Sequence, residues 1–400
     1  MPGLGRKVFA PGEVLTATNV QNYLMDQAVQ VYAGTAARGS AIGSATTDGM
    51  VSWLQDTDQL QVATGTATWQ DVSLVQSPNY VINGGFDIWQ RGTTFTSTLG
   101  AVQANTADRW NANAPASGNT VSRQPTSDTT NLPDITYCLR FSRNSGNTDT
   151  STRYLVHMLE SSQGSLLTGK QVTLSFYARK AANYSPASSL LLAEIRASSG
   201  TIDGNIFGTF TNLSNPISQN VTLTTSWQKF SITGVVASSV TQLAVVFIHS
   251  PVGTAGANDY YEITGVQLER GSVATPFRRN ANSIQGELAA CQRYYYKSQG
   301  QEIRYGFGFN RTTTTTTMVV PFPVTMRTAP TALEQSGAAA NYGVAHGNTG
   351  TVCSVVPIFR TATTVSSEVT FTVASGLTAG QGSVGYSDNT SGFLAWSAEL

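Results

Sequence analysis

The stretch that decides the fold runs from residue 81 to residue 277. It opens with VINGGFDIWQRG (81–92) and closes with YEITGVQLERG (261–271) and ATPF (274–277). Between these ends, three runs have the pattern of strands: residues 171–179, 227–233 and 242–248. The first two alternate apolar and polar side chains, because successive residues of a strand point to opposite faces. Turns rich in Gly, Asn, Ser and Pro separate such runs, so the region predicts a β jelly-roll sandwich.

Composition limits the class of protein. The 400 residues, 40% of them hydrophobic, are enough for two or three domains with cores of their own. Only 12% are charged, against about 25% in a typical soluble domain. The 23 basic and 23 acidic residues cancel, which argues against nucleic acid or an anionic membrane as a partner. We expect a soluble protein made in a cytoplasm, because no apolar run has the length of a signal peptide core or a membrane span.

The sequence offers little of the chemistry that enzymes use. Its three cysteines and three histidines are scattered without metal-ligand spacing, so we expect buried thiols and core or surface histidines. These residues are Cys138, Cys291, Cys353, His157, His249 and His346. A glycan-cleaving enzyme needs two carboxylates about 5 to 10 Å apart, and a pair such as Asp134 and Glu160 stays open at this stage. We predict no enzyme, no catalytic residue and no metal ligand.

The N-terminal part, residues 1–76, predicts one helix and two short strands. Thr18 or Asn19 can cap a helix whose apolar positions recur at helical spacing. Those positions are Val20, Tyr23 and Leu24, with Ala28 and Val31 as an extension. Residues 49–54 and 59–72 predict strands joined by a turn at residues 56–58. So small a unit buries little apolar surface, and we expect it to pack on copies of itself or on a larger assembly.

The C-terminal part predicts a linker helix and a second all-β domain. Within the linker, residues 279–297, Ser283 can start a helix that runs to Tyr294 or Tyr295. In the following domain, residues 298–400, the aromatic residues of 305–309 fall on one strand face. The threonine run 312–317 leads into 318–322 and predicts an edge or outer strand. Further strands are expected at residues 352–359, 369–373 and 393–396, and together they predict a C-terminal β-sandwich.

Several motifs, taken in order, resemble one family. NGGFDIWQRG (83–92), TADRW (106–110), LSFYAR (174–179), VQLERG (266–271) and ATPF (274–277) resemble the carbohydrate-binding-module-like jelly rolls of tail fibres and minor structural proteins of tailed bacteriophages. ELAACQRYYY (287–296) is similar to the segment that follows this domain in many of those proteins. PGEVLTA (11–17) and NYLMDQ (22–27) are similar to the opening of phage minor tail and fibre proteins. The jelly roll implied by the resemblance spans residues 77–278.

The resemblance implies a role on the virion. Such proteins are usually homotrimers that bind other tail or head proteins through the N-terminus, here residues 1–76 with Val20, Tyr23 and Leu24 as candidate attachment residues. The domain of residues 298–400 would then be distal, trimeric and directed at host cell-surface polysaccharide. Related modules often hold a structural calcium through acidic groups, but Thr264 and Gly265 stand where Asp is common. We expect no cofactor, and a structural calcium stays open.

Sugar recognition needs exposed aromatic rings beside hydroxyl and amide groups. The candidate glycan-binding residues are Tyr305, Phe307, Tyr342 and Trp396, while Trp110, Trp227, Phe176 and Phe247 are expected in cores. For the triplet 294–296, packing is favoured over sugar contact. The leading hypothesis is a tail fibre or related appendage that adsorbs to glycan without cleaving it. The alternative is a polysaccharide depolymerase or an accessory glycan-binding subunit of a hydrolase.

Overall fold

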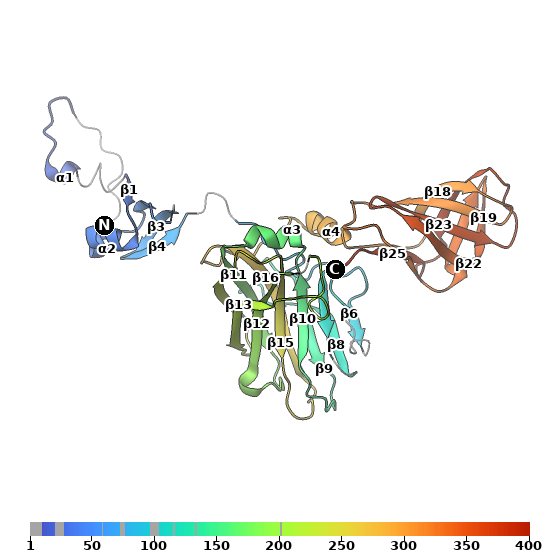
Figure 1. Cartoon of the computed structure of the whole chain (residues 1–400), viewed down its shortest axis with the longest axis horizontal. Coiled ribbons are helices and arrows are strands. Elements are labelled where there is room, and N and C mark those ends of the chain that lie inside the picture. Colours follow the sequence, from blue (N-terminus) through green and yellow to red (C-terminus); the bar gives the residue numbers. More distant parts are fainter. Residues whose placement is uncertain are drawn as a thin grey trace. The chain divides into compact units, whose positions relative to one another are not determined.

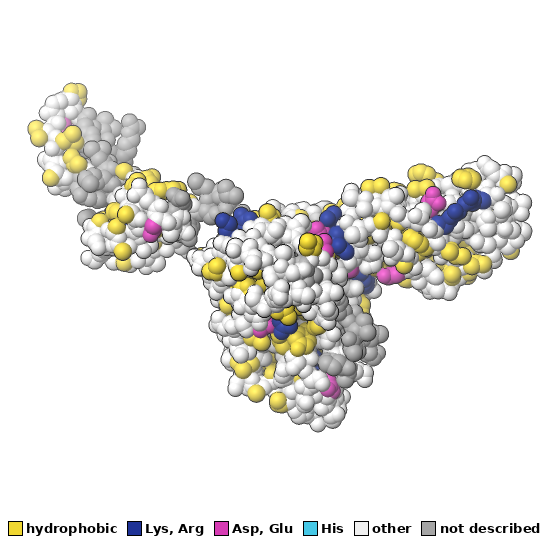
Figure 2. Space-filling model, in the orientation of Figure 1, with side chains coloured by type: hydrophobic (Ala, Val, Ile, Leu, Met, Phe, Trp, Pro, Cys, Tyr) yellow, Lys and Arg dark blue, Asp and Glu magenta, His cyan; other side chains and the backbone are white. Residues whose placement is uncertain are grey.

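The computed structural model describes residues 10–20, 28–57, 59–72, 77–96, 104–114, 117–132, 134–200 and 202–400. The chain is mostly β and divides into two compact units, Met1–Ser77 and Pro78–Leu400. The surface in Figure 2 is mostly uncharged, in line with the composition. Within these ranges no helix is long and apolar enough to cross a membrane.

The N-terminal unit is a four-stranded sheet with one short crossover helix. Its elements are α1 (Ala17–Val20), β1 (Val29–Tyr32), α2 (Thr35–Ala41), a 3₁₀ turn (Gly43–Ala45), β2 (Val51–Leu54), β3 (Gln59–Gly65) and β4 (Thr68–Asp71). The strand order is β1-β2-β3-β4. Because β1 and β2 are parallel, α2 must carry the chain back between them. The other two pairings are antiparallel.

Two of the predicted strands are confirmed here, and the helix extension is wrong. The hairpin of β2 and β3 turns at residues 55–57, as expected. Val31 lies in β1 and not in a helix, since Val29 and Val31 alternate with polar neighbours at the strand period. Val20 ends the four-residue α1. Tyr23 and Leu24 lie outside the described residues, so the attachment role of all three stays a prediction.

The sandwich begins the second unit and consists of two six-stranded sheets. The first has the order β13-β12-β15-β10-β7-β6 and the second β14-β11-β16-β9-β8-β5. The first sheet contains β6 (Ala104–Asn105), β7 (Trp110–Asn113), β10 (Arg153–Met158), β12 (Leu190–Ser198), β13 (Ser214–Thr222) and β15 (Gln242–His249). The second contains β5 (Thr94–Thr96), β8 (Asn119–Pro125), β9 (Tyr137–Arg143), β11 (Gln171–Lys180), β14 (Gln228–Val235) and β16 (Asp259–Arg270). Figure 1 shows them as a layered sandwich with α3 (Ser161–Gly164) at one end.

The core between the sheets contains the residues that alternation predicted. Trp110, Phe176 and Phe247 are fully buried in one apolar cluster. Trp227 is also buried, in a smaller cluster with Cys138. All three cysteines of the chain are free and buried, as expected.

The opening motif of the sandwich folds as a buried turn. Residues 81–86 are buried, and Asn83 and Phe86 adopt positive φ angles of 58° and 53°. The Asn83 side chain holds the turn by accepting from the Ile88 N–H (3.0 Å) and donating to the Ile88 carbonyl (2.8 Å). A Cβ on Gly84 would lie 2.0 Å from the Val266 carbonyl oxygen. Glycine is therefore required where this motif meets the closing strand β16.

The linker helix is confirmed, and the domain after it closes into a barrel. In α4 (Ile284–Gln292) the Ser283 side chain accepts from the Gly286 N–H at 3.1 Å, a standard N-cap. A three-stranded sheet follows, with β17 (Tyr295–Gln299), β25 (Phe393–Ser397) and β20 (Glu334–Gln335). The barrel order is β18-β19-β23-β22-β21-β24. Its strands are β18 (Arg304–Asn310), β19 (Thr315–Pro321), β21 (Tyr342–His346), β22 (Thr349–Ala362), β23 (Ser366–Val373) and β24 (Gly382–Ser387).

The barrel changes two expectations. The predicted strands are present, and four of them, β18, β19, β22 and β23, close with β21 and β24 into a six-stranded barrel where a sandwich was expected. The fifth, β25, lies in the three-stranded sheet. The end of the threonine run enters β19, which pairs with β18 on one side and β23 on the other. The threonine run thus leads into a strand, as predicted, but of the two alternatives the edge strand is wrong, because a closed barrel has no edge.

Candidate functional site

The structure buries three of the four aromatic residues predicted to contact sugar. Tyr305 is 4% exposed, and Tyr342 and Trp396 are fully buried in the C-terminal core. The Tyr342 hydroxyl donates to the Phe393 carbonyl at 2.7 Å. The Trp396 ring stacks on Tyr296 with centroids 5.9 Å apart. A ring with no exposed face cannot stack on a sugar, so the prediction is wrong for these three.

A β-bulge explains why Tyr305 differs from its neighbours on β18. The register between β18 and β24 shifts between Arg304 and Gly306. An extra residue in one strand reverses which face the next side chain occupies. Tyr305 therefore points into the barrel, whereas Phe307 and Phe309 are 71% and 54% exposed. Of the four predicted sugar contacts, only Phe307 presents a ring to solvent.

Phe307 lies on an exposed part of the barrel wall, beside an aliphatic side chain. Phe307 pairs directly across the strands with Val319, which is 45% exposed. Val319 in turn pairs across the strands with Glu368 on β23, whose carboxylate lies 3.8 Å from the Arg360 guanidinium on β22. This wall offers flat apolar contact beside one exposed ion pair.

The tyrosine triplet packs in the protein. Tyr294 and Tyr295 are 1% and 2% exposed. The Arg109 guanidinium lies 3.5 Å from the Tyr294 ring centroid, and the Arg91 guanidinium lies 3.5 Å from that of Tyr295. Burial raises the pKa of both phenols above the usual range. The triplet thus joins the linker to the sandwich, as the packing interpretation expected.

A second surface lies on the outer face of the first sandwich sheet and was missed in the sequence. On β12 the residues Leu191, Ala193 and Ile195 face the core, so Glu194 and Arg196 face outward. The Glu194 side chain is only 4% exposed although it lies on this face. A carboxylate so placed must be well satisfied by donors.

Three donors satisfy Glu194. Its carboxylate accepts from the Ser218 hydroxyl at 2.8 Å, the Asn215 amide at 3.3 Å and the Arg196 guanidinium at 2.8 Å. Ser218 lies opposite Glu194 on β13. Asn215 and Ser218 are themselves exposed, so an amide and a hydroxyl are held in fixed positions at the surface.

Aromatic rings border this polar cluster. The Arg196 guanidinium lies 5.6 Å from the Tyr154 ring centroid. The Tyr154 ring meets Phe207 edge to face at 5.5 Å, and Phe207 is 38% exposed. We name these residues together the Glu194 surface: Tyr154, Glu194, Arg196, Phe207, Asn215 and Ser218. The combination of rings with amide, hydroxyl and guanidinium groups suits a hydroxylated ligand with an apolar face, such as a sugar.

The sequence contained one signal for this surface. In LLLAEIRAS, residues 190–198, a glutamate and an arginine stand two positions apart in an otherwise apolar strand. Charged residues at the strand period place their side chains on one face. The remaining members come from β10, β13 and the loop between β12 and β13, so only the fold brings them together.

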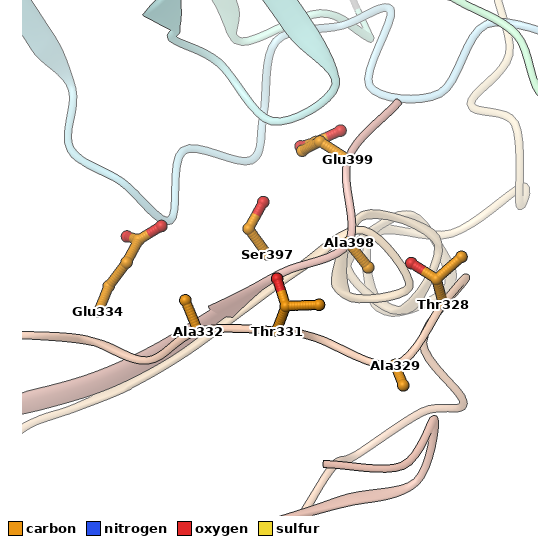
Figure 3. Close-up of a pocket in the computed structure, with 8 residues that line it drawn as sticks. All are labelled: Thr328, Ala329, Thr331, Ala332, Glu334, Ser397, Ala398 and Glu399. Carbon is orange, nitrogen blue, oxygen red and sulfur yellow. The ribbon is translucent and has the colours of Figure 1, made fainter. Parts of the chain in front are cut away.

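A pocket of about 350 Å³ lies beside the end of β25 (Figure 3). Its lining, drawn in Figure 3, is Thr328, Ala329, Thr331, Ala332, Glu334, Ser397, Ala398 and Glu399. Glu399 is paired with Arg91 at 3.3 Å and with Arg109, and Glu334 accepts from the Tyr295 hydroxyl at 2.9 Å. The lining has hydroxyls but no aromatic ring, and protein donors already occupy both carboxylates. The pocket therefore fits a sugar less well than the Glu194 surface does.

Two acidic residues near the first and last strands of the sandwich, where related modules hold calcium, are bound by protein groups. Asp87 pairs with Arg279 at 2.8 Å, and Glu269 accepts from the Thr275 hydroxyl at 2.7 Å. Within the part of the chain that the structure describes, no group of three or more His, Cys, Asp or Glu residues could hold a metal ion.

Of the two carboxylates left open by the sequence, Glu160 is held by protein donors. Glu160 is paired with Arg293 at 3.0 Å. Burial acts to raise the pKa of Glu160, but hydrogen bonds from Arg293 and its neighbours outweigh burial and lower it. An ionised, paired carboxylate is a poor general acid.

The three histidines contact other protein groups, and two of them are deeply buried. Burial lowers the pKa of His157 well below its ordinary value and that of His249 to about 3, so both are neutral. His157 Nε2 accepts from the Ile82 N–H at 3.1 Å in the opening motif. His346 lies on β21, and its Nε2 is 3.1 Å from the Thr351 hydroxyl.

Comparisons with known proteins give remote structural likenesses. No family model and no curated protein matches the chain. The solved structure "CBM4 structure and function" is 16% identical, with a TM-score of 0.28, and the match covers 48% of this chain and 99% of the other. A second, TmCBM61 in complex with β-1,4-galactotriose, is 16% identical with a TM-score of 0.30, over 49% and 100% of the two chains.

A third likeness is to the enzymatically active domain of bacteriophage CBA120 tailspike protein 4. It is 14% identical with a TM-score of 0.31, over 48% of this chain and 21% of the other. These values establish no family. The class of protein is defined by the described structure: a mostly β chain in which a sandwich is followed by a closed barrel.

Proposed function

We propose that this chain is a structural protein of a bacteriophage virion, a homotrimeric tail fibre or related appendage that adsorbs to host surface polysaccharide without cleaving it. Residues 1–76 would attach it to other tail or head proteins. The virion part of the proposal rests on the sequence motifs at residues 11–27, 83–92 and 266–277. The glycan-binding part rests on one observation, the Glu194 surface.

The Glu194 surface supports sugar binding because its polar groups are held in place before a ligand arrives. Glu194 fixes Asn215 and Ser218 through hydrogen bonds and orients Arg196 toward the Tyr154 ring. Groups that need no reordering lose less entropy on binding. A pyranose can stack its apolar face on the rings while the remaining N–H groups of Asn215 and Arg196 donate to its hydroxyls and the Ser218 oxygen accepts from them. Three copies of a weak site in one homotrimer would raise the effective concentration enough to hold a particle.

The test uses the full chain and polysaccharide isolated from the host surface. We expect Phe207→Ala to weaken binding about tenfold or more, since about 1.4 kcal/mol of contact corresponds to a factor of ten. Phe207 is partly exposed in a loop, so its loss should leave the fold intact. Phe307→Ala is the matched control, because it removes an equally large ring from the barrel wall. Surface plasmon resonance or calorimetry gives both affinities.

Each outcome of this experiment identifies or excludes a candidate glycan site. If Phe307→Ala abolishes binding and Phe207→Ala does not, the glycan site lies on the barrel. If neither variant weakens binding to the polysaccharide, both surfaces are excluded. Release of new reducing ends from the polysaccharide by the wild-type chain would favour the depolymerase alternative over the adhesin.

A further inference from the structure

The sheet of the N-terminal unit has two unlike faces. On one face α2 lies over the strands: Arg38 is 6% exposed, donates to the Ser52 hydroxyl at 2.9 Å and stacks 4.0 Å from the centroid of a Trp69 ring. Leu54 and Ala63 on the same side are 0% and 1% exposed. This face is closed by the unit's own helix.

The opposite face carries two rows of side chains that cross all four strands. Cross-strand register gives the first row as Val29, Val51, Val62 and Gln70. The second row is Val31, Trp53 and Leu60, continued by Val72, whose N–H donates to the Leu60 carbonyl at 2.7 Å. We name these eight residues the valine face.

The members of the valine face are partly or largely exposed among the residues that the structure describes. Val29 and Val31 at the edge strand are 56% and 59% exposed, and the other members are partly exposed. Figure 2 shows apolar side chains on the surface of this unit. A continuous apolar surface of this kind usually marks an interaction site. The unit is also too small to be stable through its one covered face, so a permanent cover would stabilise it.

The chemistry of the rows fits a second copy of the same face. Among the eight members no side chain is charged, so the face can meet its own copy without burying an ion. Permanent homo-oligomer interfaces are apolar with charges depleted at the centre, whereas transient partners meet through more polar surfaces. In a homotrimer, three copies of one face can meet around the three-fold axis, because closed symmetry turns the same surface of every subunit toward that axis.

We propose that the valine face is the surface through which copies of this chain associate. The inference rests on the homotrimeric part of the proposed function and adds the residues that form the contact. It places copies of β1 and β2 near one another, with Val31 and Trp53 at the contact.

A cysteine placed on the face tests proximity directly. The chain's three native cysteines are all buried, so Val31→Cys provides the one accessible thiol. We expect Val31→Cys chains to form disulfide-linked pairs on mild oxidation, seen on a non-reducing gel. Val252→Cys is the matched control, since Val252 is 52% exposed on a sandwich loop and should stay unlinked. Equal linking of the two variants, or none at Val31→Cys, would overturn the assignment.

A charge placed on the face tests whether it holds the assembly together. We expect the wild-type chain to sediment as a homo-oligomer and Val31→Glu to sediment at the mass of one chain, while Val252→Glu keeps the wild-type mass. If the wild type already has the mass of one chain, the homotrimer itself fails. If the wild type is an oligomer and Val31→Glu keeps its mass, only the assignment of this face fails, and the cover is another segment of the chain or another protein.

Discussion

Two sheets of this protein differ in how their outer, partly apolar faces are covered. The first sandwich sheet and the N-terminal sheet both have one face packed on their own unit and a second face with apolar side chains. On the sandwich sheet, Ile206 and Phe210 from the loop after β12 cover the outer residues Val156 and Val246. On the N-terminal sheet no described residue is packed over Val29 or Val31 to that extent, and both remain more than half exposed. The outer face of the first sheet is covered by its own loop, whereas the described part of the N-terminal unit leaves Val29 and Val31 for the partner proposed above.

The polar content of the two faces differs as well. The sandwich face includes Glu194 and Arg196, held in a network with Asn215. The valine face has no charged member. A fixed polar network beside rings suits a soluble ligand that comes and goes, whereas an uncharged apolar face suits a permanent subunit contact. The proposed binding surface and the proposed assembly surface therefore differ in their charged content.

The largest effect should come from the sandwich core. Trp110 packs against Phe86 with centroids 4.9 Å apart, and its indole N–H donates to the Asn83 carbonyl at 3.1 Å. We expect Trp110→Ala to lower the free energy of unfolding of the Pro78–Leu400 unit by about 3 to 5 kcal/mol. Trp53→Ala, on the valine face, should leave that value unchanged. Denaturant unfolding followed by circular dichroism measures both, and a similar loss in the two variants would contradict the separation of the units.

The next effect is a loss of stability in mild acid. His249 lies among the rings of Phe141, Tyr184 and Tyr261, and burial holds its pKa at about 3. The pKa in the folded state is lower than the usual value of about 6.5 in the unfolded chain. The unfolded state therefore binds the proton first, and stability that is complete above about pH 6.5 falls by about 1.4 kcal/mol per pH unit as the pH drops toward 3.

The variant His249→Phe isolates this term. It keeps an aromatic ring at the position and removes the titrating group. Other groups, among them Asp108 whose pKa burial raises to about 6, shift the profile with the opposite sign but are common to both proteins. Unfolding free energies at several pH values between 7 and 4.5 should diverge steadily between wild type and variant. Parallel profiles would show that His249 is not kept neutral by burial.

Local patterns in the sequence predicted the sandwich well. Alternation over residues 171–179 placed Phe176 in the core, and the apolar run 242–248 became the fully buried β15, because both patterns report the face that a strand buries. The prediction that the helix extends to Val31 is wrong. Val29 and Val31 lie two positions apart, which is the period of a strand, and so short a run does not distinguish a strand from a helix.

The binding surface was harder to predict because it depends on contacts between distant segments. Strict alternation placed Tyr305 with Phe307 and Phe309 on one face, but the bulge at Arg304 and Gly306 turns Tyr305 inward. A bulge depends on the register with a partner strand, here β24, some 80 residues later, and no local pattern contains it. The Glu194 surface likewise needs Phe207 from a loop to lie beside Tyr154.

The smallest expected effect tests whether the loop after β12 stabilises the outer face of the first sandwich sheet. Ile206 and Ile202 stand in the same loop, yet Ile206 is 8% exposed in the outer cluster and Ile202 is 77% exposed. Removing one methylene from a packed isoleucine costs about 0.5 to 1.5 kcal/mol, whereas the same change in solvent costs less than about 0.5 kcal/mol. We therefore expect Ile206→Val to lower the unfolding free energy of the Pro78–Leu400 unit by about 1 kcal/mol and Ile202→Val to leave it unchanged. Equal losses of unfolding free energy in the two variants would mean that the loop does not stabilise the first sandwich sheet. The outer faces of the two sheets would then not differ in how they are covered.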